Sequence, residues 1–394
     1  MNGTIYMPVG EVCSSISDTY REKKNRVTLI NTSDVLEGRV LNHERVPNSN
    51  LKGQFKKTFQ RDDILYSEIR PQNRRFAYVD FSPIDYIAST KLMVIRAKKD
   101  VVSPKYLYYF LKNSSTVAEL QLLAETRSGT FPQITFSEVA NLTIPVPSLA
   151  VQEVIVQTMQ CLEDKITCNE QINDNLEQQA QAIYHERFET VSPNDLPSDW
   201  RIVTLGEVAT ISNKSFNPLK EPEILLEHYS IPAFDEARFP VFELSTSIKS
   251  NKFIIDASCF MISKLNPTTK RVWKPYCLTG NAVCSTEFIV YKAKDQSITD
   301  FLYSVIDSGS FSDFMCSHVT GSTGSRQRTT PSDTLSYELI LPSEDELAEF
   351  QSLVSPMYAQ MRINAIENDK LKRLRDSLLP KLMSGEIDVS AVQL

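Results

Sequence analysis

The chain has 394 residues, of which 41% are hydrophobic, and its net charge is −7. This length predicts two or three domains, and no apolar run is long enough to cross a bilayer. The start of the sequence lacks the basic-then-apolar layout of a signal peptide, and its seven cysteines include no Cys-x-x-Cys pair. The sequence therefore predicts a cytoplasmic protein with reduced thiols, no membrane partner and no metal site.

The negative charge is unevenly distributed along the chain. Residues 1–148 hold 20 Lys and Arg against 15 Asp and Glu, whereas residues 149–189 hold 2 against 8. The first block is therefore basic, and the segment after it is acidic. A nucleic-acid partner is consequently not excluded by the acidity of the whole chain.

Residues 1–148 have the pattern of a mixed α/β domain. Alternating apolar runs at 64–69 and 92–96 predict strands. The segment 105–123, with aromatic residues on one face, predicts one helix, and residues 141–146 predict a final strand. This first domain leads directly into a long helical segment.

Residues 149–189 contain neither Gly nor Pro and carry a heptad pattern. A helix of this length, at about 1.5 Å per residue, would span roughly 60 Å. One globular core cannot cover that length, so we expect a partner helix. The predicted helix-pairing residues are Ile155, Met159, Leu162, Ile166, Asn169, Asn173 and Leu176.

The second half of the chain repeats the first at an offset of 195 or 196 residues. A linker at 190–199, with two prolines, precedes a second α/β domain at 200–342. Val9-Gly10-Glu11-Val12 recurs as Leu205-Gly206-Glu207-Val208, and many later positions match as well. Strands are predicted at 253–255, 288–291 and 337–341, and one helix at 300–315.

A second long helix is predicted at 343–384, followed by a tail at 385–394. Pro356 predicts a kink or a restart of this helix. Two seam asparagines stand at the same repeat positions as in the first long helix, and such polar seam residues fix the register of a helix pair. The predicted pairing residues here are Met357, Met361, Asn364, Asn368, Leu371 and Leu378.

Two similar domains on a helical spacer would hold two binding surfaces at a fixed distance. If both surfaces read double-stranded DNA, the target would be two short sequences separated by unread base pairs. Lys and Arg neutralise phosphates, and Arg also reads guanine; the alternative for each such residue is an ordinary solvated surface charge. The candidate DNA-binding residues are Lys56, Lys57, Arg61, Arg70, Arg74, Arg75, Arg127, Lys264, Lys270, Arg271, Lys274, Arg326 and Arg328.

The sequence offers no candidate catalytic residues. It has no Gly-x-Ser-x-Gly, no phosphate-binding Gly-x-x-x-x-Gly-Lys-Ser/Thr, and no glycine fingerprint for a nucleotide or S-adenosylmethionine. Its four histidines do not stand at matching positions of the repeat. These observations indicate a binding protein and disfavour a self-contained nuclease or methyltransferase.

The chain resembles the specificity subunit of type I restriction–modification systems over essentially its full length. The resemblance is carried by the Gly-Glu-Val domain openings and by Ser128-Gly129 through Ile144-Pro145-Val146-Pro147, which runs into a long helix. The ending from Leu374 to Glu386 and the two-fold order of domain and helix add to it.

This resemblance implies an α+β protein with two target-recognition domains in tandem, separated by two long antiparallel coiled-coil helices. Each domain would read one half of an asymmetric DNA target. The helices would bind two methyltransferase subunits, and a restriction subunit with translocase activity can join them. S-adenosylmethionine, ATP and Mg would belong to those partners, and this chain would bind no cofactor.

A different hypothesis is a non-enzymatic scaffold, in which the two domains bind proteins and the charges are ordinary surface. Salt distinguishes the two hypotheses, because DNA binding through phosphates weakens steeply as salt rises and protein scaffolding need not.

Overall fold

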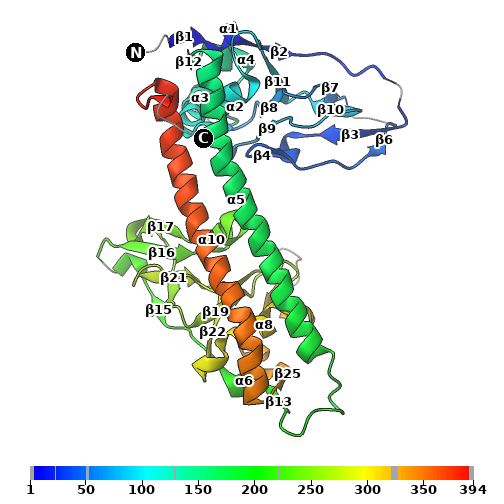
Figure 1. The fold of residues 1–394 in the computed structure, drawn as a ribbon, viewed down its shortest axis with the longest axis vertical. Coiled ribbons are helices and arrows are strands. Elements are labelled where there is room, and N and C mark those ends of the chain that lie inside the picture. Colours follow the sequence, from blue (N-terminus) through cyan, green and yellow to red (C-terminus); the bar gives the residue numbers. More distant parts are fainter. Residues whose placement is uncertain are drawn as a thin grey trace. The chain divides into compact units, whose positions relative to one another are not determined.

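The computed structural model describes residues 4–22, 24–49, 53–127, 130–220, 222–320 and 327–389. The chain forms two compact units, one comprising residues up to Lys165 together with those from Leu371, and the other Ile166–Lys370. Two long helices, α5 (Leu149–Tyr184) and α10 (Glu344–Ser384), each contribute a segment to both units (Figure 1).

Two four-stranded sheets and two pairs of strands form the body of the first unit. Their strands are β1 (Ile5–Pro8), β2 (Cys13–Ile16), β3 (Arg26–Ile30), β4 (Val35–Leu36), β5 (Arg39–Val40), β6 (Val46–Pro47), β7 (Phe55–Lys57), β8 (Ile64–Ser67), β9 (Phe76–Tyr78), β10 (Tyr86–Ser89), β11 (Leu92–Ala97) and β12 (Thr143–Val146). One sheet has the order β6-β3-β10-β7, with β3 and β10 parallel, and the other has the antiparallel order β2-β11-β8-β9. β1 pairs with β12, and β4 pairs with β5.

The second unit repeats this arrangement. Its strands are β13 (Arg201–Thr204), β14 (Ala209–Ile211), β15 (Ser215–Phe216), β16 (Leu225–Tyr229), β17 (Val241–Leu244), β18 (Lys252–Ile254), β19 (Cys259–Ser263), β20 (Val272–Trp273), β21 (Ala282–Ser285), β22 (Phe288–Ala293), β23 (Val319–Thr320), β24 (Arg328–Thr329) and β25 (Glu338–Leu341). The order β14-β22-β19-β20 matches the antiparallel sheet of the first unit, and β15-β18-β21-β16-β17 matches its mixed sheet, with β16 and β21 parallel. β13 pairs with β25 as β1 does with β12.

The remaining helices cover the sheets. The first unit has α1 (Val9–Val12), α2 (Pro104–Lys112), α3 (Ser114–Arg127) and α4 (Phe136–Asn141), and the second has α6 (Leu205–Val208), α7 (Ile231–Ala237), α8 (Thr299–Asp307) and α9 (Gly309–Ser317). The predictions of one helix at 105–123 and one at 300–315 were therefore wrong. Each helix is interrupted at its equivalent residue, Asn113 or Ser308, which has an extended ψ and an N–H that bonds back three residues.

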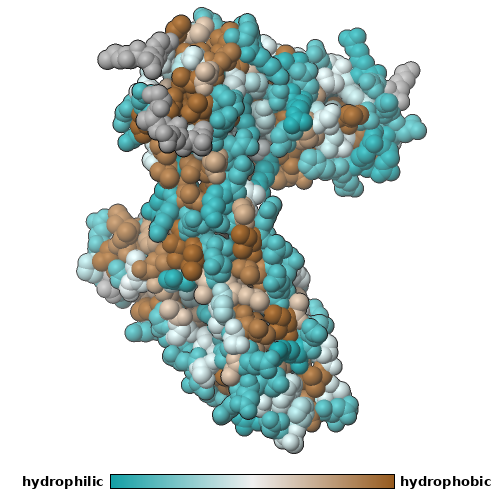
Figure 2. Space-filling model, in the orientation of Figure 1, coloured by the Kyte–Doolittle hydropathy of each residue, from teal (hydrophilic) through white to brown (hydrophobic). Residues whose placement is uncertain are grey.

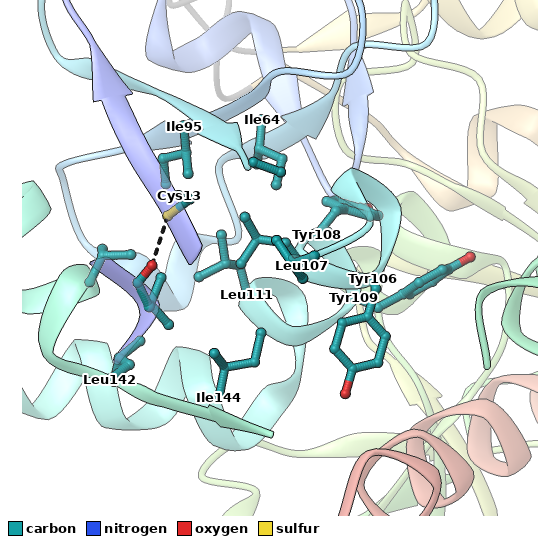
Figure 3. Close-up of a cluster of buried hydrophobic side chains, with 14 of the residues drawn as sticks. Cys13, Ile64, Ile95, Tyr106, Leu107, Tyr108, Tyr109, Leu111, Leu142 and Ile144 are labelled. Carbon is teal, nitrogen blue, oxygen red and sulfur yellow. Dashed lines mark hydrogen bonds between the residues drawn. The ribbon is translucent and has the colours of Figure 1, made fainter. Parts of the chain in front are cut away.

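The core of the first unit lies between the antiparallel sheet, α2 and the start of α5. Cys13, Ile64 and Ile95 face Leu107 and Leu111 of α2, and all five residues are buried (Figure 3). The cluster extends to Ile155 and Met159 of α5 and to Leu379 and Leu382 of α10. The long helices are therefore part of the domain core rather than an appendage to it.

Within each unit the two long helices run antiparallel. In the second unit Asn169 donates to the Asn368 side chain at 2.9 Å, and Asn364 donates to that of Asn173 at 2.9 Å. Asn169 and Asn173 also donate across the pair to Glu367 Oε2 and to the Met361 carbonyl oxygen, and Asn368 donates to the Ile166 carbonyl oxygen. Because buried amides require partners, a shifted register would leave these groups unsatisfied.

Pro356 does not interrupt α10, contrary to the prediction. The helix is continuous from Glu344 to Ser384. The carbonyl that loses its helical donor belongs to Ser352, and both Ser352 and Pro356 are exposed. Water can therefore satisfy that carbonyl, and the cost of the proline is reduced.

The contact between each domain and its long helix uses different chemistry at equivalent positions. In the first unit Lys112 of α2 forms an ion pair with Glu163 of α5, and the Tyr109 hydroxyl donates to the same carboxylate at 2.9 Å. In the second unit Asp307 stands in place of Lys112, Tyr358 in place of Glu163, and Ser304 in place of Tyr109. The Ser304 and Tyr358 hydroxyls share a 2.7 Å hydrogen bond.

Asp307 is buried at this contact, and its Oδ1 lies 2.8 Å from the Lys270 ammonium. Burial raises the pKa of Asp307 to about 6, although Lys270 opposes the shift; Glu177 and Arg238 act on it more weakly. The folded state therefore retains a proton that the unfolded chain loses near pH 4. We expect this group to reduce the free energy of unfolding by up to about 3 kcal/mol as pH rises from about 4 to 6.

Chemical denaturation of wild type and Asp307→Asn across this pH range tests the expectation. The stability of wild type relative to the variant should fall between pH 4 and 6 and then level off. A constant difference between the two proteins would show that Asp307 is not protonated in the folded state.

Candidate nucleic-acid interface

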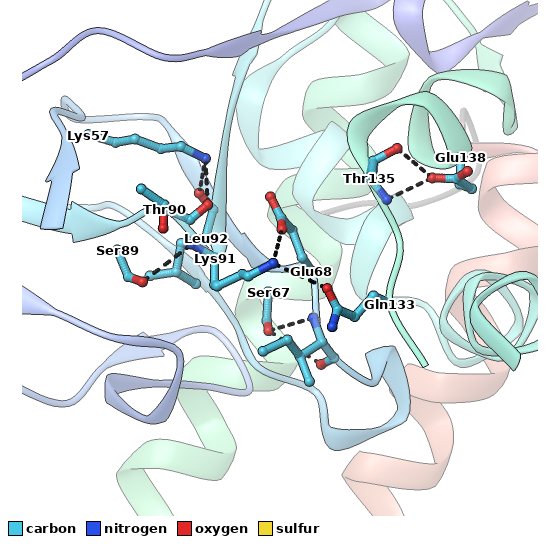
Figure 4. A network of polar contacts seen from close by, with 11 residues as sticks. Lys57, Ser67, Glu68, Ser89, Thr90, Lys91, Leu92, Gln133, Thr135 and Glu138 are labelled. Atoms are coloured by element: carbon cyan, nitrogen blue, oxygen red, sulfur yellow. Dashed lines mark hydrogen bonds and ion pairs between the residues drawn. The ribbon is translucent and has the colours of Figure 1, made fainter. Parts of the chain in front are cut away.

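Three segments meet at one edge of the first unit, and backbone hydrogen bonds hold them together. The Glu68 N–H, just after β8, donates to the Lys91 carbonyl oxygen in the turn between β10 and β11, at 3.0 Å. The Ile134 N–H donates to the Glu68 carbonyl oxygen at 2.9 Å, which brings Gln133 to the same place. We call the group of Glu68, Lys91 and Gln133 the first cradle (Figure 4).

The second unit has the same backbone arrangement. The Lys264 N–H donates to the Glu287 carbonyl oxygen at 2.9 Å, and the Thr329 N–H donates to the Lys264 carbonyl oxygen at 3.2 Å. This brings Arg328 beside the other two residues. We call Lys264, Glu287 and Arg328 the second cradle.

Serines brace both cradles in the same way. Ser67 Oγ accepts from the Ile69 N–H at 3.0 Å, and Ser263 Oγ accepts from the Leu265 N–H at 3.2 Å. Ser89 and Ser285 accept from the N–H groups of Lys91 and Glu287 at 3.3 and 3.2 Å. The two units therefore share a rigid backbone at this edge.

Lys57 belongs to the scaffold of the first cradle. Its ammonium donates to the carbonyl oxygens of Thr90 and Leu92, at 3.1 and 2.8 Å (Figure 4). Partial burial lowers the pKa of this ammonium. Lys57 thus holds the turn that carries Lys91, and a phosphate would have to compete with two carbonyl oxygens for it.

The cradle side chains differ while the backbone is the same. In the first cradle the Lys91 ammonium lies 3.5 Å from the Glu68 carboxylate and donates to the Gln133 side-chain oxygen at 3.2 Å. In the second cradle Arg328 forms two 3.0 Å hydrogen bonds with Glu287, and this pairing raises the pKa of Arg328. Both sets are partly exposed.

Arg74 and Lys270 stand at equivalent positions and cap equivalent helices. Arg74 donates to the Lys112 carbonyl oxygen at 3.4 Å, and Lys270 donates to the Asp307 carbonyl oxygen at 2.7 Å. A cation at the C-terminus of a helix is favoured there by the helix dipole. Both side chains therefore stabilise α2 and α8, besides any role toward DNA.

Other predicted DNA-binding residues also have intramolecular partners. Arg271 pairs with Asp235 at 2.6 Å, Lys274 with Asp300, and Arg127 with Glu138 at 2.7 Å. Arg75 donates to the Ser33 carbonyl oxygen at 3.0 Å. Arg326 lies outside the described residues.

Four predicted basic residues have no side-chain hydrogen bond or ion pair with the part of the chain that the structure describes: Lys56, Arg61, Arg70 and Lys264. Arg70 is exposed, and its backbone N–H donates to the Pro132 carbonyl oxygen next to the first cradle. Arg70 and Lys264 are thus the predicted cations best placed to contact an added anion at the two cradles.

The predicted helix-pairing residues are divided between the units. Ile155, Met159, Leu162 and Leu378 pack in the core of the first unit, and Met357 and Met361 pack against that of the second. Ile166 is buried, Leu176 and Leu371 are partly buried, and the four asparagines are hydrogen-bonded across the helix pair.

Sequence reasoning missed Gln152, which is fully buried near the start of α5. Its side chain accepts from the Ser103 N–H at 2.8 Å and donates to the carbonyl oxygens of Val101 and Pro147. It also missed Glu68, Lys91, Gln133 and Glu287. Three of these four residues are acidic or neutral, so basic composition does not indicate them, whereas the repeat places all cradle positions at corresponding sites of the two halves.

Neither a metal site nor a membrane span emerges from the described parts of the chain. Among these residues, no three His, Cys, Asp or Glu side chains are grouped so as to hold a metal ion. No described helix combines the length and apolar character needed to cross a bilayer.

Comparison with known proteins finds similarity to specificity subunits of type I restriction enzymes. A family model described as the type I restriction modification DNA specificity domain matches residues 6–178. The specificity subunit of the HindI type I restriction enzyme of Haemophilus influenzae is 29% identical, over 92% of this chain and 94% of that protein. The chain is similar over most of its length to the specificity subunits of type I restriction–modification systems. The MjaIX specificity subunit of Methanocaldococcus jannaschii is 25% identical, over 78% of this chain and 76% of its own.

A solved specificity subunit shares the fold. The type I restriction–modification S subunit from M. genitalium superimposes with a TM-score of 0.54 at 15% identity, covering 97% of this chain and 96% of that one. The expected architecture of two mixed α/β recognition domains in tandem with two long antiparallel helices is confirmed by this likeness and by the structure itself.

Proposed function

We propose that this specificity subunit reads an asymmetric, two-part DNA sequence, with one recognition domain on each half, and directs adenine methylation or cleavage by its partner subunits. The repeated cradle, built on the same backbone but with different side chains, carries the proposal. Two surfaces of one design with different chemistry suit two different half-sites. The paired asparagines would keep the distance between those half-sites constant.

The proposed partners are two methyltransferase subunits, to which restriction and translocase subunits can be added. S-adenosylmethionine, ATP and Mg would be bound by those subunits, and this chain would act without catalysing a reaction. Large apolar side chains exposed on the long helices in the second unit support docking there: Ile172, Leu353 and Ile363. Figure 2 shows apolar patches on the part of this unit over which α10 runs.

The alternative, a protein scaffold with two binding surfaces, is not favoured by the similarity to type I specificity subunits. The two hypotheses differ in their salt dependence, because contacts to phosphates release counterions and scaffolding contacts need not.

Arg70→Gln tests the DNA contact with little change to the scaffold. The variant should bind DNA more weakly at low salt, and the slope of log affinity against log salt should decrease by about 1. Arg75→Gln is the matched control, because its guanidinium already donates to backbone carbonyl oxygens. Equal affinities and slopes for wild type and Arg70→Gln would remove Arg70 from the interface.

A further inference from the structure

We propose that the three side chains of each cradle determine which base is preferred at one position of the corresponding half-site. This inference rests on the proposed function and adds the residues that distinguish the two half-sites. The two cradles correspond position by position. Residues 68, 91 and 133 match residues 264, 287 and 328 in backbone hydrogen bonding, and all three side chains differ.

Residues that read bases in two related domains must meet two conditions. They must be held in a fixed place, because a mobile side chain loses entropy on binding, and they must differ if the half-sites differ. The cradles meet both conditions. Their backbones are fixed by paired hydrogen bonds and by serine braces, while their side chains are Glu, Lys and Gln in one domain and Lys, Glu and Arg in the other.

The chemistry of these side chains is that of base recognition. A glutamine amide recognises adenine, an arginine or lysine recognises the O6 and N7 of guanine, and a carboxylate accepts a hydrogen bond from cytosine N4. In the first cradle the Lys91 ammonium donates a hydrogen bond to the side-chain oxygen of Gln133, and this bond fixes the orientation of the Gln133 amide (Figure 4). In the second cradle Glu287 orients the planar guanidinium of Arg328 through two hydrogen bonds.

The partial exposure of these groups agrees with such a role. The side chains of Lys91 and Arg328 are 49% and 42% exposed, whereas the acids that orient them are 20% and 29% exposed. The acidic residue therefore lies deeper and the donor lies nearer to the surface. This order leaves a donor-rich group accessible to the acceptors on the edge of a base pair.

Exchange of the cradles is the direct test. The triple variant Glu68→Lys, Lys91→Glu, Gln133→Arg gives the first domain the side chains of the second, and Gln133→Arg alone keeps the Glu68–Lys91 pair intact. Each full-length variant is purified with its methyltransferase subunits, and bound sequences are selected from random DNA and sequenced. The charge-balanced pair Lys24→Glu, Glu119→Lys, at exposed sites outside the cradle, is the matched control.

The proposal predicts a changed preference at one position of the first half-site, with the second half-site and the unread gap unchanged. For Gln133→Arg the expected change is toward guanine, by roughly 5- to 150-fold relative to wild type. The control should select the wild-type sequence. If Gln133→Arg and every active form of the cradle exchange select the wild-type first half-site, the cradle does not read bases. If wild type itself selects no two-part sequence, the proposed function fails together with this inference.

Discussion

Replacing Phe350 with Ala is expected to destabilise the second unit by about 3–5 kcal/mol, the usual cost of removing a buried aromatic ring. Phe350 of α10 is fully buried, and its ring centroid lies 5.2 Å from that of Phe188 and 6.0 Å from that of Phe301. The cavity would open where the long helices meet the recognition domain.

Leu353→Ala provides the matched control on the same helix. Leu353 is 41% exposed, so its truncation should cost well under half as much as that of Phe350. Denaturant unfolding of both variants measures the difference. Equal losses of stability would contradict the packing described for this core.

Lengthening both long helices by four residues should change the unread gap and leave both half-sites unaltered. The insertions belong after residue 171 in α5 and after residue 366 in α10, between the two asparagine pairs that face each other. Four residues add about 6 Å and a net rotation of about 40°. One base pair adds about 3.4 Å and roughly 35°. By rotation the insertion matches about one base pair and by length nearly two, so we predict a gap longer by one or two base pairs.

Insertion into α5 alone is the control for this experiment. Because α10 would keep its length, the Asn169–Asn368 and Asn173–Asn364 pairs could no longer both be aligned. Buried amides would then lose their hydrogen-bond partners. We therefore expect reduced stability and loss of DNA recognition from the single insertion. A double insertion that altered a half-site and kept the original gap would show that the helices do not set the spacing.

The repeat made much of the architecture predictable from sequence. The offset of 195 or 196 residues and the heptad seam led to two α/β domains and two long helices. The breaks at Asn113 and Ser308 lie in the polar runs 112–116 and 307–310, which are rich in turn-forming residues. The prediction of single helices followed the apolar residues on either side and passed over these runs. The prediction at Pro356 was wrong for a different reason. The free-energy cost of a proline in a helix depends on whether water reaches the carbonyl that loses its hydrogen bond, and that exposure depends on the tertiary structure.

The candidate interface was less predictable than the fold. Basic composition could not distinguish Lys57, which holds a turn, or Arg74 and Lys270, which cap helices, from Arg70, whose side chain has no such partner in the described structure. The charge of a side chain can be read from the sequence, but its partners depend on folding. The cradle positions were accessible in principle, since the two halves of the chain carry them at offsets of 195 or 196 residues.

We propose above all that this chain selects the DNA sequence modified by its methyltransferase partners. Sequencing of modified bases in the source cell, with the chain present and with its gene deleted, tests that claim most directly. We predict that one asymmetric, gapped methyladenine motif is lost on deletion and restored by complementation. An unchanged set of methylated motifs, in cells that express the methyltransferase subunit, would contradict it.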